Sequence, residues 1–177
     1  MGDRAGADNN GSWQTAIARE YVVILFMALN YLPVTADLEF DCTNYEAIST
    51  VLMEAIEATL AMGNEQPWSG YLGVTKSGTV VGICAFKGPP NENREVELAW
   101  YTFPPYERRG YGTQMAAALI QFAEARQGEV ARVVVHTEPQ IGPSSKICEK
   151  VGLGYQGEIE VPGDGRVWLW TREIAAE

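Results

Sequence analysis

The sequence has little of what marks a membrane, secreted or nucleic-acid-binding protein. The apolar run YVVILFMAL at residues 21–29 has nine residues, whereas a membrane-spanning helix needs about twenty. It also lacks the basic flank and the small-residue cleavage site of a secretory signal. Basic residues are scarce, since 13 Lys and Arg stand against 23 Asp and Glu, a net charge of −10. Such a surface repels phosphate groups, so we expect neither nucleic acid nor a membrane as a partner, and an amine-bearing substrate meets a favourable field.

Disulfide and metal signatures are also missing. The three cysteines, Cys42, Cys84 and Cys148, are far apart in the sequence and show no CxxC spacing. An odd number of cysteines without a secretory signal is typical of reduced thiols in the cytoplasm. The single histidine, His136, leaves no Cys/His ligand pairs of the kind that bind structural zinc. We therefore expect a cytoplasmic protein without a metal ion.

The length and the hydrophobic pattern predict one folded domain. Residues 1–12 are rich in Gly, Asp and Asn and predict a disordered tail, and residues 13–177 are enough for a single domain with a sizeable core. Apolar spacing of three and four predicts a helix over residues 43–62, and Ser77-Gly78 predicts a hairpin. Further strands are predicted at 21–32 (where a short helix is the alternative), 68–76, 79–87, 94–103, 130–137, 154–161 and 166–172, and further helices from about 113 to 128 and over 144–151. This order indicates an α+β or α/β sheet domain.

The decapeptide YERRGYGTQM, residues 106–115, concentrates two arginines and two glycines in an acidic chain. It lies between a predicted strand, which stops at Pro104-Pro105, and a predicted helix. This order directs backbone N–H groups to a point in front of a helix N-terminus, where the helix dipole favours an anion. Glycines allow a phosphate to approach the backbone, and arginines suit its oxygens. The loop matches neither GxxxxGK[ST] nor GxGxxG, so it is either a pyrophosphate site of another kind or a solvent-facing turn.

Several segments, in order, resemble the GNAT (Gcn5-related) N-acetyltransferase superfamily and its RimJ/RimL-like branch. FPPYERRGYGTQMAAALIQFA resembles the acetyl-CoA-binding segment, VELAWYTFPPY the central strand, and VVVHT the strand after the cofactor helix. SSKICEKVGL resembles the family's short helix motif, and GEIEVPGDGRVWLW its closing strands. The resemblance covers about residues 66–172. It implies a single α+β (α/β) domain whose mixed, mostly antiparallel sheet is flanked by helices and splayed into a V between strands 4 and 5.

The resemblance also implies acetyl-CoA as the co-substrate. Backbone groups of Tyr101, Thr102 and Phe103 are expected to contact the pantetheine arm and the thioester carbonyl. The pyrophosphate cradle is expected from Arg108, Arg109, Gly110, Tyr111, Gly112 and Thr113, and Ser144 is expected to cap the short helix beside the cofactor. The sequence departs from the family pattern at Glu107, where Gln or Arg is usual, and at Gly142, where Asn is usual.

Acetylation of an amine requires a proton acceptor for the ammonium and a proton for the departing thiolate. By position, Glu97 is the first candidate for the general base, and His136, on the neighbouring strand, is the second. Each has a purely structural alternative, as a salt-bridged glutamate or as a strand-end histidine. Cys148 stands where many relatives have a proton-donating tyrosine, and it is either a thiol donor or a buried apolar residue.

We therefore expect an acetyl-CoA-dependent N-acetyltransferase that moves an acetyl group by direct transfer to a primary amine. The acceptor is expected to be a small molecule or a protein N-terminus. The departures at Glu107, Gly142 and Cys148 motivate the alternative of a catalytically weak acyl-CoA-binding or regulatory module. Either protein would be a monomer or a homodimer, and no motif in the sequence identifies the acceptor.

Overall fold

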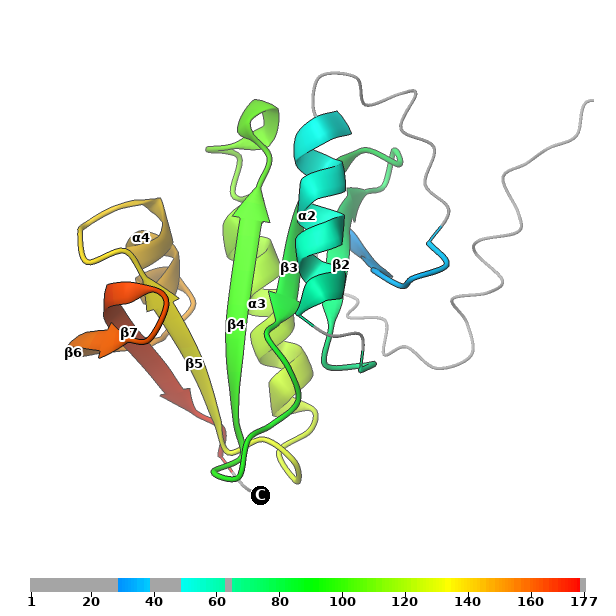
Figure 1. The fold of residues 1–177 in the computed structure, drawn as a ribbon. Helices are drawn as coiled ribbons and strands as arrows, with labels where there is room; N and C mark the ends of the chain where they lie inside the picture. The colour runs from blue at the N-terminus through cyan, green and yellow to red at the C-terminus, as the bar shows by residue number, and fades with distance from the viewer. Residues whose placement is uncertain (1–28, 39–48, 63–64, 176–177) are drawn as a thin grey trace, which may run out of the picture.

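The computed structural model describes residues 29–38, 49–62 and 65–175 (Figure 1). In chain order, the elements are β1 (Leu29–Pro33), α2 (Ser49–Ala61), β2 (Gly70–Thr75), β3 (Val80–Phe86), β4 (Glu95–Thr102), a 3-10 turn at Pro104–Tyr106, α3 (Tyr111–Glu124), β5 (Arg132–Thr137), α4 (Pro143–Lys150), β6 (Gly154–Val161) and β7 (Gly165–Glu173). The predicted tail at 1–12, most of the strand predicted at 21–32, the first part of the helix predicted at 43–62, and Cys42 lie outside the described residues.

Seven strands form one sheet in the order β1-β2-β3-β4-β5-β7-β6. All neighbours are antiparallel except β4 and β5, which run parallel. This parallel pair is short, because it holds only from Glu95 opposite Arg132 to Glu97 opposite Val134. Beyond Glu97 the two strands diverge, and Figure 1 shows them as the arms of a V. We call this gap the split. The predicted fold, with its opening between the fourth and fifth strands, is confirmed.

One face of the sheet packs against α3 and α4. The core on this side includes Met115, Leu119 and Ile120 of α3 and Cys148 of α4. It also includes strand residues from both sides of the split, among them Val96 and Leu98 of β4, Val133 and Val135 of β5, and Trp170 of β7. Gly82 of β3 explains how closely the helix approaches, since a Cβ there would lie 2.8 Å from Met115 Cε and 2.4 Å from Tyr101 O. The α3 side is therefore one continuous core.

The opposite face is covered at β2 and β3 by α2, which lies in front of these strands in Figure 1. Leu52 and Ile56 of α2 pack with Leu72, Val80 and Ile83 of the sheet. Every residue of β3 is buried as a result. In contrast, β6 has no buried residue. In the part of the chain that the structure describes, helix packing on this face thus stops at the split.

Both ends of α3 differ from the prediction by two residues or more. The helix predicted from about residue 113 begins at Tyr111, because Gly110 adopts a φ of 82° and ends the loop there. It ends at Glu124, four residues before Gly128. Among the residues described, no helix is long and apolar enough to cross a membrane.

Candidate active site

The N-terminus of α3 lies at the end of the loop that follows β4. Its N-cap is Gly110, which has no side chain to accept a hydrogen bond. The first helical bond runs from Gln114 N–H to Gly110 O, at 3.1 Å. The N–H groups of Tyr111, Gly112 and Thr113 therefore precede the helical ladder, and Thr113 is not the cap. Uncapped N–H groups at a helix N-terminus form a site for an anion.

The two arginines before this helix end are exposed. Arg109 lies over the Tyr106 ring, 5.9 Å from its centroid. Arg108 adopts a φ of 60°, a left-handed conformation that costs an ordinary residue about 1–3 kcal/mol. Within the described part of the chain, neither guanidinium forms an ion pair. Both charges are thus available to an anion at the start of α3.

The start of α3 also lies directly against the end of β4. A Cβ at Gly112 would lie 3.2 Å from Thr102 Oγ1 and 2.8 Å from Ile147 Cδ1 of α4. The absence of a side chain at Gly112 therefore lets the helix terminus, β4 and α4 meet. The candidate anion site borders the open end of the split.

The backbone N–H and C=O groups of β4 point alternately toward β3 and toward β5. Lys87 N–H donates to Glu97 O at 2.9 Å, and Phe103 N–H donates to Val81 O at 3.0 Å. Backbone groups along a strand alternate in direction, so Trp100 and Thr102 present theirs toward the split. Of the three residues expected to contact pantetheine, Thr102 has this orientation, whereas the backbone groups of Tyr101 and Phe103 are directed to β3. Trp100 was not predicted to contact pantetheine, and it is the second residue whose backbone groups face the split.

Glu97 and His136 meet at the base of the split. His136 Nδ1 lies 3.1 Å from Glu97 Oε1, and the Lys87 ammonium pairs with the same carboxylate oxygen. The imidazole is 15% exposed and the carboxylate 27%. Since a carboxylate only accepts hydrogen bonds, we assign the imidazole proton to Nδ1, which leaves Nε2 as a proton acceptor. The two residues predicted as alternative bases thus form one hydrogen-bonded pair, and Lys87 is an addition that the sequence did not reveal.

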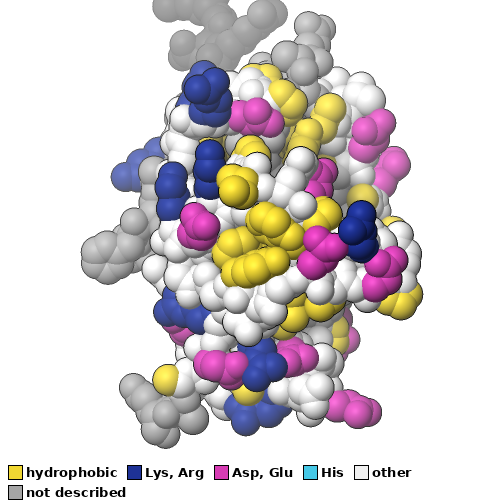
Figure 2. All heavy atoms as spheres, turned by 90° about the vertical axis from the view of Figure 1, so that its left-hand side faces the viewer, with side chains coloured by type: hydrophobic (Ala, Val, Ile, Leu, Met, Phe, Trp, Pro, Cys, Tyr) yellow, Lys and Arg dark blue, Asp and Glu magenta, His cyan; other side chains and the backbone are white. Residues whose placement is uncertain are grey.

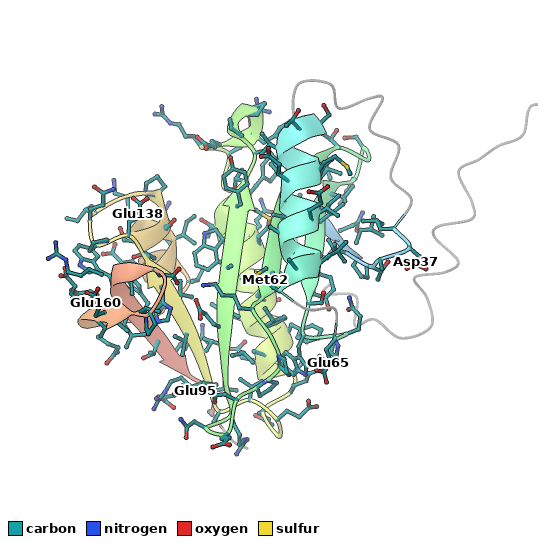
Figure 3. All side chains as sticks on the ribbon, viewed as in Figure 1. Asp37, Met62, Glu65, Glu95, Glu138 and Glu160 are labelled. Carbon is teal, nitrogen blue, oxygen red and sulfur yellow. The ribbon has the colours of Figure 1, made fainter. Side chains whose placement is uncertain are left out.

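The closed end of the V is held by a second group of charges. Arg132 of β5 bonds Glu95 of β4 at 2.7 Å, and it also bonds Glu173 of β7. Hydrogen bonding to Glu173, and to a lesser extent to Glu95, raises the pKa of the Arg132 guanidinium. Glu95 lies at the foot of the V in Figure 3. Three strands are therefore tied together below the point where β4 and β5 separate.

A cleft of about 410 Å³ lies on the face of the sheet opposite α3. Val96 and Leu98 belong to the α3-side core, so the alternate residues Glu95 and Glu97 point to the other face. The cleft is lined by these two glutamates, by Lys87, Arg132 and His136, and by apolar side chains that include Leu169. Its volume is within the range of small-molecule sites. The Glu97–His136 pair thus faces both the cleft and the base of the split.

The structure argues against Cys148 as a proton donor. Its side chain is fully buried, and burial raises the pKa of the thiol to about 12. The thiol of CoA is an ordinary thiol with a pKa of about 8.5. A Cys148 thiol that is a weaker acid than this would not protonate the departing CoA thiolate. Cys148 therefore fits the apolar alternative.

The expected cap at Ser144 is wrong. Ser145 makes the capping contacts of α4, because its hydroxyl accepts from Gly142 N–H at 2.9 Å and lies 3.0 Å from Gly142 O. Ser144 is exposed as the second residue of the helix. Ser144 was expected because it aligns with the serine of the family motif. Ser145 makes the contact instead, because the third helical position has the geometry for it. Whether Ser144 touches a cofactor stays a prediction.

Comparison with known proteins places the chain in a family. Residues 35–154 match the family model of the acetyltransferase (GNAT) domain. The uncharacterized N-acetyltransferase YjdG of Bacillus subtilis (strain 168) is 34% identical over 74 residues, which cover 42% of this chain and 44% of that protein. The chain thus belongs to the acetyltransferase (GNAT) domain family, as the sequence motifs predicted. No group of metal-binding side chains is present among the described residues.

Solved structures share the fold at low identity. The apo form of RimL, a ribosomal L7/L12 alpha-N-protein acetyltransferase, superposes with a TM-score of 0.64 at 14% identity, covering 85% of this chain and 96% of that one. The microcin C7 self-immunity acetyltransferase MccE, in complex with acetyl-CoA and AMP, gives a TM-score of 0.58 at 14% identity, covering 71% and 72%. These likenesses support the fold alone.

Proposed function

We propose that the protein transfers an acetyl group from acetyl-CoA directly to a primary amine of a small molecule or of a protein N-terminus. The hydrogen-bonded Glu97–His136 pair, at the base of the split and in the wall of the cleft, carries the proposal. It gives the site a proton acceptor at the point where acetyl-CoA in the split and an amine in the cleft would meet. The structure of MccE, which holds acetyl-CoA, supports this choice of donor.

The residues around the split fit acetyl-CoA in their chemistry. The N–H groups of Tyr111, Gly112 and Thr113, with Arg108 and Arg109, suit the pyrophosphate. The open edge of β4 at Trp100 and Thr102 suits the amides of the pantetheine arm, because it offers donors and acceptors that no strand uses. When bound, acetyl-CoA supplies an activated acetyl group as a thioester. Since the split begins at Glu97, the acetyl end belongs next to Glu97 and His136.

The Glu97–His136 pair prepares the amine. An acceptor enters as an ammonium, which must lose a proton before its nitrogen can attack a carbonyl. His136 Nε2 takes this proton, while Glu97 holds the ring in position and stabilises the imidazolium. Because Cys148 is too weak an acid, we assign the proton of the departing thiolate to the same imidazolium.

A panel of amines tests the proposal. Purified protein is mixed with acetyl-CoA and with polyamines, aminoglycosides, amino-acid derivatives and peptides bearing a free N-terminus, and release of free thiol is followed. We expect turnover with one class and binding of CoA by calorimetry. Binding without turnover on any amine would favour the acyl-CoA-binding module, and the absence of binding would contradict both functions.

A further inference from the structure

Lys87 is the one lysine that lines the cleft. It follows β3, and its backbone N–H bonds Glu97 O of β4 at 2.9 Å. Its side chain is 36% exposed, and its ammonium contacts Glu97 Oε1, the oxygen that also bonds His136. Lys87 thus has a primary amine on the same carboxylate that the proposed reaction uses.

The position of this amine matches that of an acceptor. The ammonium of an incoming substrate has to reach the Glu97–His136 pair from the cleft, and the Lys87 ammonium is already there. Its nitrogen is carried on a stem of four rotatable carbons, which allows it to turn from Glu97 toward the adjoining base of the split. Tethering also gives it a high effective concentration, which replaces the affinity that a free amine would need.

We propose that Lys87 is an acetylation site of the protein itself, modified from acetyl-CoA bound in the split when no other amine fills the cleft. This inference rests on the proposed function. The Lys87 ammonium first gives a proton to the Glu97–His136 pair, and Nζ then attacks the thioester carbonyl carbon. An N–C bond forms and the C–S bond breaks. Of the two protons that the nitrogen loses, one ends on the sulfur of CoA and the other passes to water, so neither an oxidant nor a reductant is needed.

The modification changes the cleft electrostatically. An acetylated Lys87 is neutral and no longer forms an ion pair with Glu97, so the cleft loses one positive charge. Glu97, Glu95 and His136 stay in place, and Arg132 is the remaining cation of the lining. Self-acetylation therefore shifts the acceptor preference toward cationic amines, and it removes the ammonium that competes with them for Glu97.

The other lysines provide internal controls. The chain contains only four lysines, and Lys76, Lys146 and Lys150 are the other three. Lys76 lies in the turn between β2 and β3, and the other two lie on α4; all three are exposed. Slow chemical acetylation by the thioester should reach these exposed amines at least as easily as Lys87. Faster acetylation of Lys87 than of the other lysines would therefore show that the reaction takes place at the site and is not chemical acetylation in solution.

The experiment follows acetylation of the full chain. Protein and acetyl-CoA are incubated without an acceptor, and each lysine is scored over time by peptide mass spectrometry, alongside calorimetric CoA binding. We expect Lys87 to be modified at least about tenfold faster than Lys76, at a rate independent of protein concentration. Lys87→Arg should abolish this rapid phase and Lys76→Arg should leave it unchanged. Glu97→Gln should slow it while CoA binding persists.

Each result separates the inference from the function. Modification of Lys87 no faster than of Lys76, or equally fast in heat-denatured protein, overturns the inference. A protein that acetylates an added amine but leaves Lys87 unmodified overturns it as well, and leaves the proposed function intact. Failure to bind CoA would instead remove the proposed function.

Discussion

The two sides of the split share one sheet but differ in how their faces are covered. On the α3 side, both halves contribute to a single core. On the other side, β2 and β3 are packed under α2, whereas β5, β7 and β6 present the cleft and exposed side chains. Figure 2 views the molecule from the left-hand side of Figure 1, and it shows hydrophobic side chains at the surface in the middle of that face, ringed by charges. Tyr155 and Ile159 of β6 are among the exposed hydrophobic residues.

This difference shows what the sheet does for the site. A face covered by a helix has no space for a ligand, and a sheet uncovered on both faces would not hold its side chains in place. Among the residues described, the second half is packed on one face and uncovered on the other. Glu97, His136 and Lys87 lie at the border between the two halves, with rigid strands beneath them and solvent in front. The border is therefore where a substrate can meet positioned charges.

Disrupting the Glu97–His136 pair at this border should have the largest effect. Glu97→Gln keeps the size of the side chain but removes the carboxylate, and the acetyl-transfer rate should fall by about 10²–10⁴. Because Glu97 acts through its hydrogen bond to His136, the double variant with His136→Gln should be only slightly less active than the less active of the two single variants. Steady-state kinetics on an acceptor found in the screen measures all three.

The controls are CoA affinity and pH. Calorimetry should give wild-type affinity for CoA in each variant, and a higher pH should partly restore the rate, since more of the amine is then neutral. Strictly multiplicative losses in the double variant would show that Glu97 and His136 act independently. Full activity in both single variants would mean that solvent deprotonates the amine and that the site only positions it.

A matched pair of isoleucines tests the difference in packing. Ile83 of β3 is 7% exposed and belongs to the α2-side core, while Ile159 of β6 is 36% exposed. Ile83→Ala should lower the free energy of unfolding by about 2–5 kcal/mol, and Ile159→Ala by about 0.5 kcal/mol or less. Urea denaturation at neutral pH measures both. Equal losses would mean that the open half is as tightly packed as the covered half.

The loop before α3 borders both halves and is the proposed pyrophosphate site, so a change of charge there distinguishes an effect on CoA binding from an effect on folding. Gly110 has a φ of 82°, and a Cβ at this position would meet no other atom within 4 Å. Asn and Asp both adopt this conformation more readily than most other residues, so Gly110→Asn and Gly110→Asp differ mainly in charge. The aspartate should weaken CoA binding by about 1.5–3 kcal/mol relative to the asparagine. Indistinguishable affinities would remove this loop from the cofactor site.

Much of the fold followed from local patterns. The Ser77-Gly78 turn, the β-branched runs and the stop at Pro104-Pro105 place β2, β3 and β4 to within two residues. The loop YERRGYG likewise predicted a helix N-terminus directly after the two arginines, and the binding of an anion there stays a prediction. These features are local because each depends on the conformational preferences of neighbouring residues.

The rest depended on register, which local patterns do not determine. Glu97 and His136 were predicted as alternatives, and their contact follows from the parallel pairing of Glu97 with Val134. Lys87 reaches Glu97 because β3 and β4 pair across the loop at residues 88–94, whose path the sequence does not specify. Register also decides that the backbone groups of Trp100, and not those of Tyr101, face the split. A shift of one residue would reverse the direction of every backbone group along the strand.

The buried thiols give the smallest expected effect, and they compare the α3 side of the two halves. Cys84 lies in β3 and Cys148 in α4, and both are buried. Burial raises both thiol pKa values, that of Cys148 to about 12. An unfolded thiol has a pKa near 8.5, so the folded state keeps a proton that the unfolded state loses. The stability from each thiol is thus complete below about pH 8.5 and is lost as the pH rises toward the folded pKa. Between pH 8 and 10 this loss should reach up to about 2 kcal/mol per thiol.

Urea unfolding over this pH range, referenced to pH 7, should show a shallower alkaline decline of the free energy of unfolding in Cys84→Ala and in Cys148→Ala than in the wild type. Similar changes in the two variants would confirm that the α3 side is equally closed in both halves. An unchanged slope in Cys148→Ala alone would show that α4 opens to solvent, so that the second half is loosely packed on both of its faces.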